Sequence, residues 1–274
     1  MTIADRYVVI GNPIAHSKSP QIHARFAAQT SQAISYEKLL APLDDFARKV
    51  REFMESGGRG ANVTVPFKLE AFRLADQLSS RAQAAGAVNT LSFEAGRIIG
   101  DNTDGVGLVH DIVSNAGVSI TGRQVLLMGA GGAACGVVQP LLAESPASLV
   151  IANRTPERAI ALACEFAASA DVAIRGSDFD SLTDPFDIII NATSASLTAE
   201  LPSIPDKVLS KASFVYDMMY AATPTPFLQL ASDQGAATRD GLGMLVEQAA
   251  ESFFIWRGVR PQTAPVYEWL RSQL

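Results

Sequence analysis

The chain has 274 residues, which exceeds the ~100 to 200 residues of one domain, so two domains or one large domain are expected. Hydrophobic residues make up 48% and charged residues 18% of the chain, a balance that is typical of a folded globular protein and excludes a disordered one. The net charge of −6 and the lack of a cluster of lysines and arginines argue against nucleic acid as a partner.

The location of the protein is predicted from its apolar runs. The longest of them, residues 125–138, contains several glycines and is too short to cross a bilayer, so no membrane partner is expected. Residues 1–10 lack the three regions of a secretory signal, which predicts a cytoplasmic protein. Cys135 and Cys164 form neither a disulfide framework nor a zinc-binding spacing.

Short β-branched runs alternate with alanine-rich stretches along the chain, which predicts an α/β fold with parallel sheets covered by helices. In chain order, the first strands are expected at residues 7–10, 34–40 and 61–65, followed by a hairpin formed by residues 89–93 and 98–99. A second series, which we interpret as a nucleotide-binding sheet, is expected at residues 125–128, 149–152, 172–174, 188–190 and 214–216. From Gly241 onward an apolar helical stripe must cover a sheet, but periodicity does not indicate which one.

A serine-rich stretch follows the first expected strand. Ser19 fits the N-cap of a helix and Pro20 its first position. The hydroxyls of Ser17 and Ser19 equally fit the binding of a carboxylate. The neighbouring His16 is the one histidine expected to line a cleft, and no histidine has a metal spacing, so no metal is predicted.

Two polar stretches lie near the ends of later strands. Alternation along residues 61–65 places Asn62 and Thr64 on one face, and Pro66 then ends the strand. Lys68 follows, beyond the carboxyl end, where open α/β sheets bind ligands, although lysines are mostly surface residues. The run from Asp101 to Gly105 fits either a capped loop or part of a site.

A glycine-rich turn follows the expected strand at residues 125–128. It consists of Gly129, Ala130, Gly131, Gly132 and Ala133, and Ala134 completes a G-x-G-x-x-A spacing. Glycines at such a turn let the backbone approach a pyrophosphate, and the following helix N-terminus presents free N–H groups. A plain glycine turn is the alternative, but the strand before the motif and the helix after it favour nucleotide binding.

The end of the next strand favours NADP over NAD. An NAD site needs a carboxylate there for the ribose hydroxyls, but the chain has Asn153, Arg154 and Thr155, with Arg158 one turn later. Two guanidiniums suit a 2′-phosphate, and Arg154 can stack on adenine. Arg158 also fits an ordinary surface residue of a helix whose N-cap is Thr155.

Taken together in this order, eight stretches resemble the shikimate dehydrogenase family. They are residues 17–20, 62–68, 86–90, 101–105, 129–133, 153–155, 191–194 and 241–250. No single stretch decides the matter, but eight ordered pieces with compatible spacing span essentially the whole chain, which argues against chance.

The resemblance implies a two-domain α/β fold in which a Rossmann NADP-binding domain is inserted into an open mixed-sheet substrate domain. The substrate domain would consist of residues 1–104 and 241–274, the NADP domain of residues 105–240, and the site would lie in the cleft. In such enzymes the hydroxyls matching Ser17 and Ser19 bind the substrate carboxylate. The groups expected at the ring hydroxyls are Asn62, Thr64, Asn89, Asp104, Gln248 and Tyr220.

The resemblance also assigns the cofactor contacts. The glycine turn would bind the pyrophosphate of NADP, and Asn153, Arg154, Thr155 and Arg158 would bind the adenosine phosphate. Met218 and Gly241 would lie at the nicotinamide end.

The chemistry that follows is hydride transfer coupled to proton transfer. Moving a hydride to or from a carbinol carbon requires a proton to move on the neighbouring oxygen. Lys68 is the implied acid/base, and a nearby Asp104 would favour the charged lysine and hold the same oxygen. We therefore expect reversible, NADPH-dependent reduction of 3-dehydroshikimate to shikimate, a step of aromatic amino acid and chorismate biosynthesis, by a monomer or homodimer.

Two alternatives and two departures accompany this hypothesis. A paralogue that also accepts quinate would need space for one more hydroxyl near Ser17, Ser19 and Tyr220, whereas a non-catalytic NADPH sensor would have no reason to keep Lys68 with Asp104. Where the family usually continues its glycine turn with Ser and Arg, this chain has Ala134 and Cys135, so NADP affinity is expected to be weaker. Cys135 fits either a thiol with a lowered pKa or a small packing residue. Residues 195–198 depart from the glycine that related sequences often carry.

Overall fold

The computed structural model describes residues 4–167, 170–193, 204–209 and 213–274, and the chain divides into two compact units. Unit 1 consists of Met1–Gly107 and Val246–Leu270, and unit 2 of Leu108–Leu245 and Arg271–Leu274. Each unit contains a six-stranded sheet with helices, so the predicted α/β class is confirmed. The departure expected at residues 195–198 lies outside the described residues.

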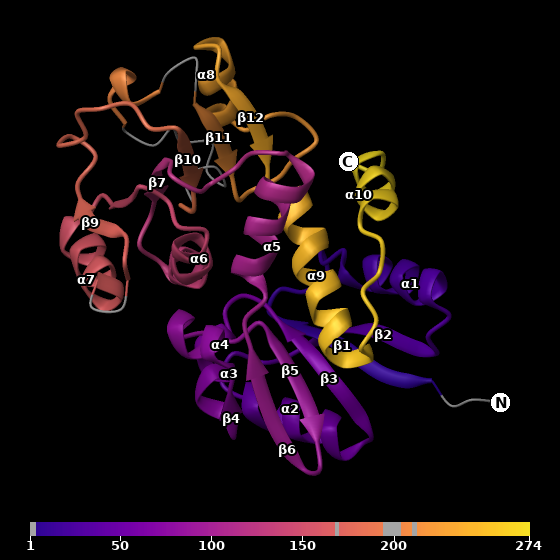
Figure 1. Cartoon of the computed structure of the whole chain (residues 1–274). Helices are drawn as coiled ribbons and strands as arrows, with labels where there is room; N and C mark the ends of the chain where they lie inside the picture. Colours follow the sequence, from indigo (N-terminus) through magenta and orange to yellow (C-terminus); the bar gives the residue numbers. More distant parts are fainter. Residues whose placement is uncertain (1–3, 168–169, 194–203, 210–212) are drawn as a thin grey trace. The chain divides into compact units, whose positions relative to one another are not determined.

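The sheet of unit 1 has the order β2-β1-β3-β5-β6-β4 (Figure 1). Strands β1, β2 and β3 are parallel, whereas β5 runs antiparallel to both of its neighbours. The carboxyl ends of β1, β3 and β6 therefore lie at the same edge as the amino end of β5. The strands are β1 Asp5–Gly11, β2 Ile34–Leu40, β3 Gly58–Val63, β4 Gln77–Leu78, β5 Thr90–Glu94 and β6 Arg97–Asp101.

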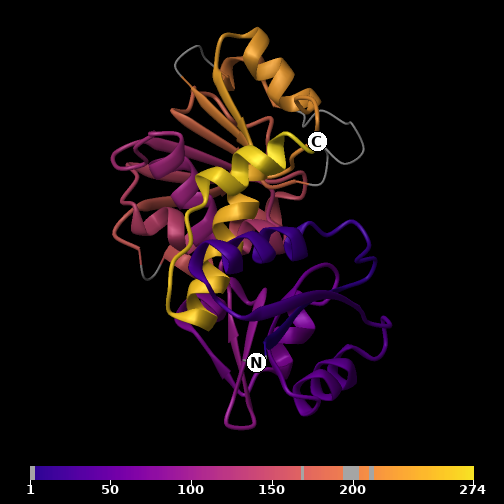
Figure 2. The same cartoon turned by 90° about the vertical axis from the view of Figure 1, so that its right-hand side faces the viewer.

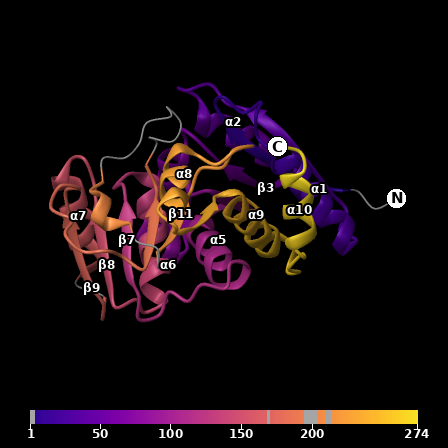
Figure 3. The same cartoon turned by 90° about the horizontal axis from the view of Figure 1, so that it is seen from above.

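Helices cover both faces of this sheet. On one face, apolar side chains of α2 and α3 pack with strand residues around Phe46 and Phe67, whose rings stack at 4.7 Å. On the other face, Phe26 of α1 packs edge-on against Phe253 of α9, with ring centroids 5.8 Å apart. Figure 3 shows α2 and α9 on opposite sides of β3, and Figure 2 shows α1 beside the yellow helices α9 and α10. The helices are α1 Ser19–Thr30, α2 Phe46–Glu55, α3 Lys68–Leu74, α4 Ser80–Ala85, α5 Asp104–His110, α9 Leu242–Arg257 and α10 Ala264–Arg271, of which α5, α9 and α10 contain residues of both units.

The structure confirms the hairpin and corrects two local predictions. The hairpin pairs β5 with β6, and its turn residues Ala95 and Gly96 both have positive φ angles, as a tight two-residue turn requires. The strand expected to reach residue 65 ends at Val63, because the backbone N–H of Phe67 bonds to the carbonyl of Thr64 and closes a turn. Ser19 lies inside α1 and not at its N-cap, which is Lys18.

The sheet of unit 2 is entirely parallel and has the order β12-β11-β10-β7-β8-β9. Read from β9, this is the 3-2-1-4-5-6 order of dinucleotide-binding sheets, in which ligands bind where the strand order reverses, here between β7 and β10. Its strands are β7 Gln124–Met128, β8 Ser148–Ala152, β9 Ala173–Ser177, β10 Ile188–Asn191, β11 Phe214–Asp217 and β12 Ala237–Asp240. Its helices include α6 Gly132–Ala143, α7 Pro156–Ala167, α8 Pro226–Asp233, a π-helical turn Asp111–Asn115 and a 3-10 turn Asp206–Val208.

Strand β12 escapes prediction because its sequence carries no apolar signal. Its four residues are exposed or half-buried, and Arg239 points back to the fully buried Asp111. Asp111 accepts hydrogen bonds from Arg239 Nε at 2.8 Å and from the Tyr216 hydroxyl at 2.8 Å. This paired buried charge ties β12 and β11 to the π-helical turn within unit 2. Among the described residues, no helix combines the length and the apolar character needed to span a membrane.

Candidate active site and cofactor site

The amino-terminal ends of two helices bring Lys68 and Asp104 together in unit 1. Lys68 is the first residue of α3 and Asp104 the first of α5. Lys68 Nζ lies 2.5 Å from Asp104 Oδ2, with the two side chains 30% and 13% exposed. The Lys68 ammonium is thus partly withdrawn from water and paired with a carboxylate, which fits the predicted site.

Asp104 is held by the neighbouring polar groups of the same edge. Asn89 Nδ2 donates to Asp104 Oδ1 at 2.8 Å and to Thr103 Oγ1 at 2.9 Å. The side-chain oxygen of Asn102 accepts from the backbone N–H of Asp104 at 3.1 Å. One carboxylate oxygen of Asp104 therefore faces Asn89 and the other faces Lys68, so the orientation of the pair is set before any substrate arrives.

Asn62, at the end of β3, is enclosed by protein. Its side-chain nitrogen lies 2.9 Å from Ser252 Oγ and 3.2 Å from Thr90 Oγ1, and its oxygen accepts from the Tyr36 hydroxyl at 2.7 Å. Asn62 and Asn89 are only 7% and 3% exposed. The amides of Asn62 and Asn89 form their hydrogen bonds with other groups of the protein. Thr64 lies beyond the end of the strand and is half-buried.

The two serines predicted to bind a carboxylate lie after β1. Ser17 Oγ donates to Ser19 Oγ at 3.2 Å and accepts from the backbone N–H of Ser19 at 3.3 Å. Burial raises the pKa of the Tyr36 hydroxyl well above its usual value, and the nearby Ser19 hydroxyl works against this rise. Gln248, on α9, lies 3.5 Å from Thr103 Oγ1 through its side-chain oxygen. His16 is exposed.

A chain of hydrogen bonds consequently runs through unit 1 from Tyr36 by way of Asn62 and Asn89 to Lys68. It includes four side chains that sequence reasoning missed as functional candidates, namely Tyr36, Thr90, Thr103 and Ser252. Thr90 and Thr103 lie in stretches that the motif analysis singled out, but nothing local marks Tyr36 or Ser252.

An ion-pair cluster fixes the loop that ends in Asp104. Arg81 Nε lies 2.7 Å from Asp101 Oδ1, and Arg81 Nη1 lies 2.9 Å from Glu251 Oε1 on α9. Burial works to raise the pKa of Asp101, but the hydrogen bonds from Arg81 and Ser79 outweigh it and hold the pKa below its usual value. Asp101 is therefore charged, and the loop from β6 to α5 is anchored on both sides.

The glycine turn of unit 2 lies at the reversal point of its sheet. Gly129 has a φ of +105°, and a Cβ atom there would come within 3.2 Å of the Ala192 carbonyl after β10, so this glycine is required by the fold. A Cβ on Gly131 or Gly132 would meet nothing within 4 Å. These two glycines are exposed at the start of α6, where a helix N-terminus offers free N–H groups to an anion.

The end of β8 presents two guanidiniums. Arg154, Thr155 and Arg158 are exposed, and the side-chain amide of Asn153 donates to the Thr155 carbonyl at 2.9 Å, which shapes the turn. Within the parts of the chain that the structure describes, the guanidiniums of Arg154 and Arg158 have no ion-pair or hydrogen-bond partner, although the backbone N–H of Arg158 donates to the Thr155 carbonyl at 3.1 Å. Helix α7 begins at Pro156, so Arg158 lies in its first turn, as predicted.

Met218 and Gly241 pack closely at the carboxyl ends of β11 and β12. A Cβ on Gly241 would lie 2.1 Å from the Met218 carbonyl oxygen, so no larger residue fits. The buried Asp217 accepts from the backbone N–H of Met219 at 3.1 Å and from the Thr225 hydroxyl at 2.7 Å. Tyr220 is half-buried in unit 2, and burial raises the pKa of its hydroxyl.

Cys135 does not have the properties of a reactive thiol. It is half-buried in α6, and burial raises the pKa of its thiol above the usual value. The suggestion of a lowered pKa is therefore wrong, because desolvation of the thiolate outweighs the effect of the helix N-terminus.

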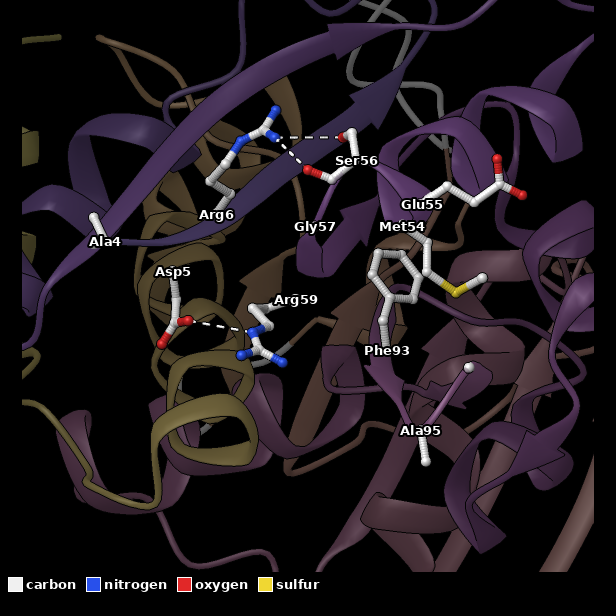
Figure 4. Close-up of a pocket in the computed structure, with 12 residues that line it drawn as sticks. Ala4, Asp5, Arg6, Met54, Glu55, Ser56, Gly57, Arg59, Phe93 and Ala95 are labelled. Carbon is white, nitrogen blue, oxygen red and sulfur yellow. Dashed lines mark hydrogen bonds and ion pairs between the residues drawn. The ribbon is translucent and has the colours of Figure 1, made fainter. Parts of the chain in front are cut away.

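A hollow of about 670 Å³ in unit 1 lies at the opposite, amino-terminal edge of the sheet (Figure 4). Its two guanidiniums already have partners, because Arg6 donates to the Ser56 carbonyl at 2.9 Å and Arg59 to Asp5 at 3.2 Å. It contains none of the residues of the Lys68–Asp104 edge.

Comparison with known proteins gives the family. Three family models match the chain: the shikimate dehydrogenase substrate binding domain over residues 9–91, shikimate / quinate 5-dehydrogenase over residues 110–204, and the shikimate 5′-dehydrogenase C-terminal domain over residues 241–271. A curated shikimate dehydrogenase (NADP(+)) from Janthinobacterium sp. (strain Marseille) is 63% identical over 273 residues, which cover 100% of this chain and 99% of that protein. The chain belongs to the shikimate dehydrogenase family.

Solved structures of this fold span more than one substrate. The shikimate 5-dehydrogenase of Thermus thermophilus, determined with NADP(H) and shikimate, has a TM-score of 0.88 at 31% identity and covers 98% of this chain and 100% of its own. A 5-ketofructose reductase from Gluconobacter sp. strain CHM43 has a TM-score of 0.89 at 26% identity, with full coverage of both chains (100% each). The family, the oxidoreductase class and the NADP cofactor predicted from the sequence are confirmed.

Proposed function

We propose that this shikimate dehydrogenase reversibly reduces 3-dehydroshikimate to shikimate with NADPH, using Lys68 and Asp104 as its acid/base pair. The observation that carries this proposal is the 2.5 Å contact of Lys68 Nζ with Asp104 Oδ2 beyond the carboxyl ends of β3 and β6 in unit 1. In this proposal residues 1–104 and 241–274 form the substrate domain and residues 105–240 the NADP domain.

The residues of unit 2 fit NADP. The open space above Gly131 and Gly132 suits a pyrophosphate that approaches the backbone closely. The unpartnered guanidiniums of Arg154 and Arg158 suit a 2′-phosphate, and no carboxylate competes at Asn153. Ala130, Ala133, Asn153 and Thr155 would complete this site, with Met218 and Gly241 at the nicotinamide end. NADPH supplies the hydride when it is bound.

The Lys68–Asp104 pair supplies the proton. As a hydride adds to the carbonyl carbon, negative charge develops on the carbonyl oxygen, and the Lys68 ammonium donates a proton from Nζ to that oxygen, which becomes the hydroxyl. The reverse reaction returns that proton to Nζ. Asp104, held by Asn89, keeps the lysine positioned and accepts a hydrogen bond from the hydroxyl once the substrate oxygen is protonated.

The remaining substrate contacts follow from the same edge. We propose that Ser17 and Ser19 bind the carboxylate and that Thr64, Gln248 and Tyr220 bind ring hydroxyls. The burial of Asn62 and Asn89 suggests that their contribution is largely to hold these groups in place. We further propose a cytoplasmic protein that acts as a monomer or homodimer without nucleic acid, which sedimentation and fractionation would test.

Initial rates of formation of the reduced cofactor, NADPH or NADH, test the reaction directly. The purified chain is offered shikimate or quinate, each with NADP or NAD. We expect turnover with shikimate and NADP, and equal rates with quinate would identify the alternative shikimate/quinate enzyme. No turnover with either acid, together with intact NADPH binding, would leave the non-catalytic sensor.

Substitution Lys68→Ala should lower kcat by about 10²- to 10⁴-fold at saturating substrate, the usual contribution of a positioned acid/base. Lys49→Ala is the control and should retain its rate, because Lys49 is a half-buried lysine of α2 in the same unit that pairs with Glu52 at 3.0 Å. Asp104→Asn should also lower kcat, and the double variant should lose less than the product of the two effects because the pair acts as a unit. Near-full turnover of Lys68→Ala would contradict the assignment.

A further inference from the structure

Tyr36 lies at one end of the hydrogen-bond chain of unit 1. It lies on β2, its hydroxyl donates to Asn62 Oδ1 at 2.7 Å, and the Ser19 hydroxyl lies nearby. The tyrosine thus lies between the serines after β1 and the amide at the end of β3, and it is hydrogen-bonded to that amide. Strands β1 and β3 are neighbours in the sheet.

The ring of Tyr36 is held by a buried histidine. His23 of α1 stacks on it with ring centroids 4.1 Å apart and an interplanar angle of 6°. His23 has no exposed surface, and neither ring nitrogen has a hydrogen-bond partner of good geometry among the described residues. Burial lowers the pKa of His23 to about 3, with a small opposing effect from Asn62, so the imidazole is neutral at physiological pH.

The environment of His23 makes this support rigid. Its ring packs edge-on against Phe26 at 5.9 Å and lies near Phe253 and Trp256 of α9, at 6.1 and 5.5 Å. A neutral imidazole in an aromatic pocket acts here as a flat packing surface. It leaves the Tyr36 ring little freedom and directs its hydroxyl at Asn62.

Asn62 depends on that hydroxyl. The nitrogen of its amide already faces Ser252, Thr90 and the Asn89 carbonyl, so its oxygen is the atom that needs an outside donor. Tyr36 is the one donor of good geometry to this oxygen among the residues that the structure describes. Removing it leaves a buried acceptor unsatisfied, which favours rotation of the amide and disturbs its partners.

We propose that Tyr36 is a positioning residue for the substrate-carboxylate end of the site, acting through Ser19 and Asn62 and supported by His23. The proposal rests on the function proposed above. Because the proton-transfer pair has its own support in Asn89, loss of the Tyr36 hydroxyl acts on substrate binding and leaves the chemical step nearly unchanged.

The variant Tyr36→Phe tests this, since it keeps the stacked ring and removes only the hydroxyl. We expect the KM for shikimate to rise about tenfold, as for a buried group that loses its partner, while kcat and the KM for NADP change by less than about threefold. Shikimate methyl ester lacks the charged carboxylate, so the KM for this ester should differ less between parent and variant than the KM for shikimate does.

Tyr7→Phe is the matched control. Tyr7 is another buried tyrosine of the same sheet, stacked on Trp256 at 4.6 Å, but its hydroxyl lies 3.5 Å from Arg257, away from Asn62. The KM of Tyr7→Phe for shikimate should equal that of the parent enzyme. The double variant of Tyr36→Phe with Asn62→Ala should raise the KM for shikimate by less than the product of the two single effects, because the two residues share one contact.

Several results would overturn the proposal. An unchanged KM for shikimate, with or without a lower melting temperature, would reduce Tyr36 to a folding role. Equal rises in KM for shikimate and for shikimate methyl ester in Tyr36→Phe would do the same. So would rises in the KM for shikimate that multiply fully when Tyr36→Phe is combined with Asn62→Ala. If Tyr36→Phe is not recovered folded, Asn62→Ala alone must show the raised KM for shikimate. Failure of the parent enzyme to turn over shikimate is a different result, because it refutes the proposed function itself.

Discussion

At the scale of single residues, cofactor choice depends on two exposed guanidiniums at the end of β8. Removing both, as Arg154→Ala with Arg158→Ala, should raise the KM for NADP by about 10- to 100-fold, the equivalent of one lost charge-assisted contact or more. The KM for NAD, which has no 2′-phosphate, should stay unchanged. Steady-state kinetics with both cofactors gives the comparison.

Arg123→Ala is the control for this pair. Arg123 lies just before the amino-terminal end of β7, 3.6 Å from Asp187 and at the opposite end of the strands from Arg154. Its removal should change the KM for neither cofactor. Equal rises in the KM for NADP and for NAD in the Arg154→Ala, Arg158→Ala double variant would refute a 2′-phosphate contact.

Buried His23 should make stability depend on pH. The folded protein binds a proton at His23 only near pH 3, whereas the unfolded chain binds it below its ordinary pKa of 6.5. The unfolded state therefore takes up the proton first as pH falls, and the free energy of unfolding should decrease by about 1.4 kcal/mol per pH unit below pH 6.5.

Urea unfolding of the parent and His23→Phe measures this slope. The useful window lies between pH 6.5 and about 4.5, because the carboxylates with lowered pKa, such as Asp5 and Asp101, add their own loss of stability at lower pH. The variant should show a flatter pH dependence than the parent. Parallel pH dependences would mean that His23 is not neutral in the fold.

At the scale of elements, the glycines of the β7–α6 turn separate into two kinds. Gly129→Ala should lower the melting temperature, because a positive φ for a side-chain residue costs about 1–3 kcal/mol and the Ala192 carbonyl is close. Gly131→Ala meets no neighbour and should leave the melting temperature unchanged. It should instead raise the KM for NADP by about tenfold or more, since the new methyl group fills space meant for a pyrophosphate.

Thermal melting with and without NADP distinguishes the two effects. The opposite pattern, with Gly131→Ala unstable and its NADP binding intact, would show that the turn is structural only.

At the scale of the whole molecule, unit 1 is completed by residues from the far end of the chain. Phe253 of α9 is fully buried against Phe26 and His23, so Phe253→Ala should lower the free energy of unfolding by about 3–5 kcal/mol. The adjacent Phe254 is 43% exposed, and Phe254→Ala should change the free energy of unfolding by about 0.5 kcal/mol or less. Urea unfolding of both variants tests whether α9 belongs to the core of unit 1. Equal free energies of unfolding for Phe253→Ala and Phe254→Ala would argue that it does not.

The sequence by itself determined those features of this protein that depend on neighbouring residues. The α/β class, the hairpin at Ala95 and Gly96, the glycine turn and the choice of NADP over NAD were predictable, because each is encoded within a few positions of the chain. Local backbone preferences and the side chains that follow a strand suffice for such features.

Only the tertiary structure decided how the polar groups of the site share their hydrogen bonds. Ser252 and Asn62 are 190 positions apart, and Tyr36 belongs to a strand whose burial pattern has no clear alternation. β12 likewise forms from polar residues because its backbone pairs with β11 and Arg239 reaches Asp111. Such partners are chosen by the packing of elements that are distant in the chain, and no local pattern of residues records that choice.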